Sequence, residues 1–237
     1  MDDAHYLIEY RFQGSLKYDI RSMINHLQKR FHLPSDKEFP HITLAGGFTT
    51  NNEKQLLKDF DSICSKTPLS KFTIDGFGYF ENKTGVIFIN IKPSENLKIF
   101  RWTVAQTISR YCKLREFDYK PDFKFHATLL MNLNDYDFSK IKKYIDTVTE
   151  PQYEQILIRV TILKNSRILC EYDFLQRRLL NRTEALSERE LTKTFHLLKE
   201  FFRGNYDPNV GSAPKKIIKQ ESWLSKIPFI GKLFSGR

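Results

Sequence analysis

Hydrophobic residues recur along this chain with two periods, and their alternation predicts a mixed fold of helices and strands. Tyr6, Ile8 and Tyr10 alternate with Leu7, Glu9 and Arg11, which predicts a strand. Apolar residues then recur at helical spacing from Ile20 to Phe31, and Pro34 ends that helix. Further strands are predicted at 40–48, 71–80, 85–92, 123–131, 153–163 and 167–174, with helices over 53–63, 97–111 and 138–148 between them. A capping box of Thr50 and Glu53 is expected to open the helix at 53–63.

The order of these elements repeats once. A strand, a helix, a second strand, a helix and a third strand follow one another over residues 6–80, and the same order returns over 85–163. Such a repeat predicts an internal duplication of architecture. We therefore expect an α+β fold in one domain, residues 1–180, with two pseudo-symmetric βαβ-type lobes at about 1–80 and 85–175. Two sheets should surround a central cleft, with helices outside.

Residues 181–237 differ in character and are expected to form a C-terminal extension. Ser187 and Glu190 make a capping box for a helix over about 187–203, and Gly204 follows its end. A linker then leads to a segment that mixes Lys with Ile, Trp and Phe. This tail either packs on the domain or stays partly disordered, or it docks to a membrane surface or a protein partner.

The composition is that of a globular protein with a basic tail. Of 237 residues, 41% are hydrophobic, and the formal net charge is +10. Residues 175–237 hold 13 Lys and Arg against 6 Asp and Glu, so most of the excess lies there and suits a polyanionic partner. The three cysteines are widely spaced and predict neither disulfides nor a zinc site. With no secretory signal pattern and no apolar run of ~18 residues, a cytoplasmic location is expected. The oligomeric state is open, with a monomer as the default.

Two tripeptides carry the candidate chemistry: His41-Ile42-Thr43 and His126-Ala127-Thr128. Residues two apart on a strand point the same way, so each tripeptide places an imidazole and a hydroxyl on one face. Brought face to face, the two pairs would supply a general acid, a general base and two hydroxyl donors around one phosphate. This chemistry needs no metal ion and no cofactor.

One such pair on a strand can arise by chance, but both pairs fall at equivalent points of the duplicated pattern. The other four histidines have no comparable partner and are expected to be ordinary residues: His5, His26, His32 and His196. Metal binding by the two motif histidines alone is not favoured, because no carboxylate or thiolate stands at ligand spacing.

The paired HIT and HAT motifs, their place in the duplicated pattern and the segment SRILCEYDFLQRRLL resemble the two-histidine phosphoesterase superfamily. The resemblance is to its LigT-like branch of 2′-5′ RNA ligases and 2′,3′-cyclic phosphodiesterases, and it covers about residues 4–182. It implies a metal-independent hydrolase that converts a 2′,3′-cyclic phosphate, on RNA ends or small nucleotides, to a 2′-phosphate, with 2′-5′ ligation as the reverse reaction. It also implies that His41 is the acid and His126 the base. Many members carry an arginine shortly after the second motif, where this chain reads Leu129-Leu130-Met131.

Three further residues are candidates for substrate contacts, each with a plainer alternative. Lys124 lies two residues before His126 and either meets a phosphate or is solvated. Phe48, which follows Gly46-Gly47, either stacks on a base beside a closely approaching ligand or marks a β-bulge or core contact. Arg11 lines the cleft or faces solvent.

Two other classes of function fit the sequence. A non-catalytic RNA-binding module would keep RNA affinity after both motif histidines are changed to alanine. A protein tethered through its tail would lose membrane or partner binding when residues 212–237 are removed. The sequence leaves these alternatives open.

Overall fold

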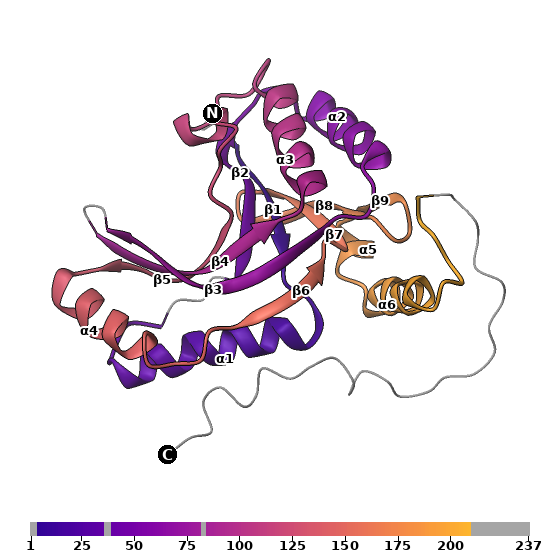
Figure 1. Ribbon diagram of the computed structural model, residues 1–237. Helices are drawn as coiled ribbons and strands as arrows, with labels where there is room; N and C mark the ends of the chain where they lie inside the picture. The colour runs from indigo at the N-terminus through magenta and orange to yellow at the C-terminus, as the bar shows by residue number, and fades with distance from the viewer. Residues whose placement is uncertain (1–3, 36–38, 82–83, 210–237) are drawn as a thin grey trace.

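The computed structural model describes residues 4–35, 39–81 and 84–209, and within these ranges the chain forms a mixture of strands and helices (Figure 1). The strands are β1 (His5–Arg11), β2 (His41–Thr49), β3 (Lys71–Glu81), β4 (Gly85–Pro93), β5 (His126–Leu133), β6 (Gln152–Ile156), β7 (Arg159–Lys164), β8 (Arg167–Asp173) and β9 (Arg178–Asn181). The helices are α1 (Gly14–Arg30), α2 (Glu53–Lys66), α3 (Glu95–Ile108), α4 (Asp135–Ile145), α5 (Arg182–Ala185) and α6 (Glu188–Phe202), with a 3₁₀ turn η1 at Glu116–Tyr119.

The strands form two antiparallel halves that meet at the two motif strands. Their order is β6-β3-β4-β5-β2-β1-β7-β8-β9, and every pairing is antiparallel. β5 and β2 are joined at the centre through the single residue pair Ile42 and Ala127. This arrangement confirms the expected α+β class, with two antiparallel sheets that are linked at the middle of the molecule.

The two halves do not come from contiguous stretches of chain, so the predicted lobe boundaries of 1–80 and 85–175 are wrong. β3 closes the first repeat in sequence but pairs with β4 of the second, whereas β7 of the second repeat pairs with β1 of the first. Helices cross over as well, because α1 contacts β5 and α3 contacts β2. Each half of the sheet thus contains strands from both repeats. This exchange holds the two motif strands in place relative to one another.

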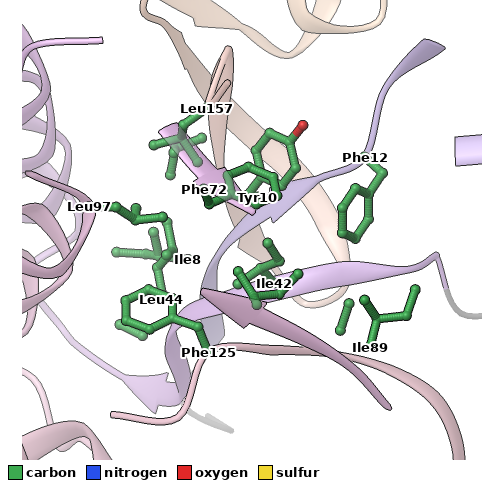
Figure 2. Close-up of a cluster of buried hydrophobic side chains, with 14 of the residues drawn as sticks. Ile8, Tyr10, Phe12, Ile42, Leu44, Phe72, Ile89, Leu97, Phe125 and Leu157 are labelled. Carbon is green, nitrogen blue, oxygen red and sulfur yellow. The ribbon is translucent and has the colours of Figure 1, made fainter. Parts of the chain in front are cut away.

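The inward residues of the motif strands anchor them in one continuous hydrophobic core. Ile42, Leu44 and Ala127 are fully buried, and they alternate with the histidines and threonines of the motifs. Figure 2 shows Ile42 and Leu44 among side chains from several elements, including Ile8 and Phe125. Because one face of each strand is committed to the core, the register is fixed and the motif side chains must lie on the other face.

The starts of α2 and α6 test the predicted capping boxes. Asn52, not Thr50, caps α2, and its side chain accepts the N–H of Gln55. Glu53 instead pairs with Lys164 at 2.6 Å. Ser187 caps α6 as predicted, since its hydroxyl accepts the N–H of Glu190. The return bond of the predicted capping box is not formed, because the N–H of Ser187 donates to the carbonyl of Glu184 instead.

Helix α6 packs on the domain through a buried polar network. Arg159 of β7 pairs with Asp173 of β8 (Nε to Oδ2, 2.8 Å) and donates to the Thr194 hydroxyl of α6 at 2.6 Å. All three side chains are buried, so α6 belongs to the folded unit rather than to a loose appendage. The predicted docking tail falls largely on 210–237, outside the described residues. Among the described helices, none combines the length and apolarity that a membrane crossing requires.

Candidate active site

The pairing of β2 with β5 brings the two motifs together. Because Ile42 lies opposite Ala127 in an antiparallel pair, His41 stands opposite Thr128 and Thr43 opposite His126. Residues opposite one another on one face have Cβ atoms about 5 Å apart. The four side chains therefore form a square in which each imidazole neighbours the hydroxyl of the other strand.

A cavity of about 960 Å³ opens over this square, and all four motif side chains line it. A smaller cavity of about 460 Å³ adjoins it and shares His41 and Thr128 with it. Ligand cavities in proteins commonly measure about 300–1,000 Å³. The larger cavity has the size of a nucleotide site.

Both imidazoles are held in the same way by the backbone. The Nδ1 atom of His41 lies 2.8 Å from the carbonyl oxygen of Phe39, and that of His126 lies 2.9 Å from the carbonyl oxygen of Lys124. A carbonyl oxygen can only accept, so Nδ1 carries the hydrogen in each ring. Nε2 is then the atom left to exchange a proton with a ligand.

The surroundings of His126 are aromatic. The rings of Phe80 and Phe88 each have their centroids 5.1 Å from the imidazole centroid. Burial lowers the pKa of His126 below the ordinary histidine value, and the nearby charges of His41 and Lys124 act in the same direction. The bond to the Lys124 carbonyl opposes part of this shift. The neutral form of His126 is therefore favoured at neutral pH.

The surroundings of His41 are charged. The buried carboxylate of Glu9 on β1 has Oε2 3.6 Å from Nδ1 of His41, and its other oxygen pairs with Nε of Arg11. A carboxylate at this distance attracts a protonated imidazole. The two histidines of the site thus make the same kind of backbone contact, but the side chains around them differ.

The structure separates the three further candidates for substrate contacts. Lys124 lines the large cavity, and its contact with a phosphate stays a prediction. Phe48 does not, because it is buried in the core and stacks on Tyr6 with centroids 5.8 Å apart, so the base-stacking hypothesis is wrong. Arg11 pairs with Glu9 and lies over the Phe39 ring, and it is not among the residues that line the cavity.

The Gly46-Gly47 pair marks a bulge, and it also makes room for a residue that sequence reasoning missed. The register between β1 and β2 shifts at this point, and Gly47 has φ of +48°. A Cβ on Gly47 would lie 2.5 Å from Nη2 of Arg115, whose guanidinium lines the cavity. No carboxylate of the described residues forms an ion pair with Arg115. The two adjacent glycines were the available signal, since they permit a close approach to the backbone.

A buried ion pair positions the loop that carries Arg115. Nη2 of Arg101 lies 3.0 Å from Oδ1 of Asp118 in η1, and the N–H of Gly46 donates to Oδ2 of Asp118. Phe117 and Phe123, on either side of Asp118 in sequence, line the cavity. The pair thus ties the loop to the first motif strand and holds its cationic and aromatic side chains over the square.

No group of three or more His, Cys, Asp or Glu suited to hold a metal ion occurs within residues 4–35, 39–81 and 84–209. The motif imidazoles and hydroxyls share the cavity with the cations Lys124, Arg115 and Lys120, and His5 and Asp122 line it as well. Together these groups can exchange two protons and bind a phosphate.

A profile of the family described as "2′-5′ RNA ligase superfamily" matches residues 16–167, which include both motifs. No curated protein matches the chain.

Solved structures with a remote likeness include Kluyveromyces marxianus Usb1 with uridine monophosphate, at 12% identity and a TM-score of 0.43, covering 76% of this chain and 98% of that one. Escherichia coli LigT complexed with 3′-AMP shows 14% identity and a TM-score of 0.43, covering 76% and 93%. A structure described as a phosphoesterase shows 16% identity and a TM-score of 0.42, covering 76% and 94%. Because these identities and TM-scores are low, membership of the family rests on the profile that matches residues 16–167 and not on these structures.

Proposed function

Because this chain belongs to the 2′-5′ RNA ligase superfamily, we propose that it is a metal-independent phosphodiesterase that opens 2′,3′-cyclic phosphates, on RNA ends or small nucleotides, to 2′-phosphates. The observation that carries the proposal is the convergence of both His-x-Thr pairs on one cavity. Uridine monophosphate and 3′-AMP, bound in the structures of Usb1 and LigT, are consistent with a nucleotide substrate.

The two histidines supply opposite halves of the reaction. Nε2 of His126 takes a proton from water, and the water oxygen attacks phosphorus. The bond from phosphorus to O3′ breaks, and Nε2 of His41 gives its proton to O3′. The products are a 2′-phosphate and a 3′-hydroxyl. The aromatic surroundings of His126 suit the base, and the Glu9 carboxylate beside His41 suits the acid.

The remaining groups of the cavity bind the phosphate. The hydroxyls of Thr43 and Thr128 donate to the non-bridging oxygens, where negative charge develops in the transition state. Lys124 and Arg115 add two cations, of which the guanidinium can form two parallel hydrogen bonds. With a 5′-hydroxyl in place of water, the same groups would join two RNA ends by a 2′-5′ bond, but concentrated water favours hydrolysis.

Turnover of a 2′,3′-cyclic nucleotide in the presence of EDTA tests this proposal. The full chain should convert 2′,3′-cyclic AMP to 2′-AMP, with the position of the phosphate assigned by phosphorus NMR. A folded protein that turns over neither cyclic nor 2′-5′-linked substrates would contradict the proposal. Formation of 3′-AMP would reject the proposed bond cleavage.

Arg115→Ala should lower kcat/KM by about 10- to 100-fold, because a charged hydrogen-bonded contact is worth about 1.5–3 kcal/mol. Steady-state kinetics with 2′,3′-cyclic AMP measures the effect. Arg110→Ala is a matched control, since it removes the same charge from an exposed position that does not line the cavity. Equal kinetics for Arg115→Ala and wild type would remove Arg115 from the phosphate site.

A further inference from the structure

Three cationic side chains surround one exposed aromatic ring at the edge of the active site. The ring of Phe39, which is 42% exposed, has Arg21 at 5.0 Å, Arg11 at 5.3 Å and Lys17 at 5.4 Å from its centroid. Arg11 comes from the end of β1, and the other two come from the first turns of α1. These four residues are called the Phe39 cluster below.

The charges of the Phe39 cluster are only partly balanced. Arg11 pairs with Glu9, but Lys17 and Arg21 form no ion pair with any of the described residues. Lys17 and Arg21 are four residues apart on one helix, where like charges repel. Contact with the face of a ring offsets this by roughly 0.5–1 kcal/mol per exposed cation. The arrangement is one that an added anion would stabilise.

The Phe39 cluster is continuous with the reaction centre. The carbonyl oxygen of Phe39 holds Nδ1 of His41, and Arg11 stands opposite His41 in the pairing of β1 with β2. Phe39 also lines the smaller cavity together with His41 and Thr128. An anion bound at the cluster would therefore lie next to the reacting phosphate, on the β1 side of the square.

We propose that the Phe39 cluster binds the backbone phosphates of a single RNA strand that continues from the reacting end. The proposal rests on the function proposed above and names a polynucleotide, rather than a mononucleotide, as the substrate. Cations that follow the backbone beside an exposed aromatic ring are the usual means of binding single strands. The cluster thus adds affinity that only a chain longer than one nucleotide can use.

The double variant Lys17→Ala/Arg21→Ala tests this, with Arg11 kept because it pairs with Glu9. On a short RNA that ends in a 2′,3′-cyclic phosphate, kcat/KM should fall about tenfold, and the slope of log kcat/KM against log salt should lessen by about 1.4 for two lost phosphate contacts. On 2′,3′-cyclic AMP the double variant should match wild type. The double variant Lys54→Ala/Lys58→Ala is the matched control, since it removes two exposed lysines at the same spacing from α2.

Equal losses on the RNA and on the mononucleotide, or no loss on either, would overturn the proposal. If wild type hydrolyses neither substrate, the proposed function fails, but the cluster can still be judged by fluorescence anisotropy with a labelled RNA. Binding that weakens in Lys17→Ala/Arg21→Ala and not in the control would support the RNA path. Unchanged binding would reject it.

Discussion

The two histidines of the site show how a duplicated motif acquires two roles. Each follows the same sequence rule, and each gives its Nδ1 hydrogen to a backbone carbonyl two residues before it. The strands beside them differ. β1 places Arg11 opposite His41 and Glu9 opposite Thr43, whereas β4 places Asn90 opposite His126 and Phe88 opposite Thr128.

This difference separates what the motif does from what its neighbours do. The motif brings an imidazole and a hydroxyl to the cavity from each strand. β1 places the carboxylate of Glu9 beside one imidazole, whereas β4 and its neighbour β3 place the rings of Phe88 and Phe80 beside the other. We infer that the flanking strands, rather than the motifs, assign the acid and the base.

The largest effects should come from the histidines themselves. His41→Ala and His126→Ala should each lower kcat on 2′,3′-cyclic AMP by about 10²–10⁴-fold, because each removes a proton-transfer group. The double variant should be little worse than either single variant, since the groups act as a unit. Single-turnover rates measure this, with circular dichroism as a control for folding. If the loss in the double variant equalled the product of the two single-variant losses, the histidines would act independently.

A smaller effect is expected from Glu9→Gln, which keeps the shape of the side chain and removes its charge. Without the carboxylate 3.6 Å from Nδ1, the imidazole of His41 loses a buried charged neighbour, so kcat on 2′,3′-cyclic AMP should fall about tenfold while KM changes little. Steady-state kinetics, measured well below the melting temperature of the variant, gives the result. A rise in KM with kcat unchanged would indicate that Glu9 does not act on the proton-transfer step.

The smallest effect is expected from Phe80→Ala, which exposes His126 to more water. Burial lowers the pKa of His126, so the variant should raise that pKa toward the ordinary value. Because the base must be neutral, the acidic limb of the kcat/KM profile should move to higher pH, and activity should be lost first in acid. An acidic limb that stays in place or moves to lower pH would show that the Phe80 ring does not set the state of His126.

Alternation and spacing were enough to predict most elements and the motif face, because these depend on neighbours in sequence. They failed where distant pairing decides the outcome. The single strand expected at 153–163 is divided into β6 and β7, which lie at opposite sides of the sheet, and β9 was not predicted. The sequence made Phe48 a candidate for a ligand contact. Its stacking partner Tyr6 lies on another strand, so local spacing could not show that Phe48 is buried.

The candidate site shows the same limit. The four motif residues and Lys124 were predictable because they share one local rule. Glu9 reads as a solvent-facing position of a strand, yet it is 1% exposed, since its face lies beneath the site rather than in water. Arg115 comes from a loop whose path depends on the buried pair of Arg101 and Asp118. The docking role of the tail and the cytoplasmic location stay predictions.

The assignment of acid and base is tested most directly with a substrate whose leaving group needs no proton. A 3′-deoxynucleoside 2′-(4-nitrophenyl phosphate) keeps the phosphate on O2′ and puts 4-nitrophenolate in the place of the O3′ leaving group. Its phenolate is stable without a proton, so the acid becomes dispensable while the base, which activates the attacking water, does not. We predict that His41→Ala recovers to within about tenfold of the wild-type rate on this ester, whereas His126→Ala keeps its loss of about 10²–10⁴-fold. Recovery by His126→Ala in place of His41→Ala, or by both variants equally, would contradict the account.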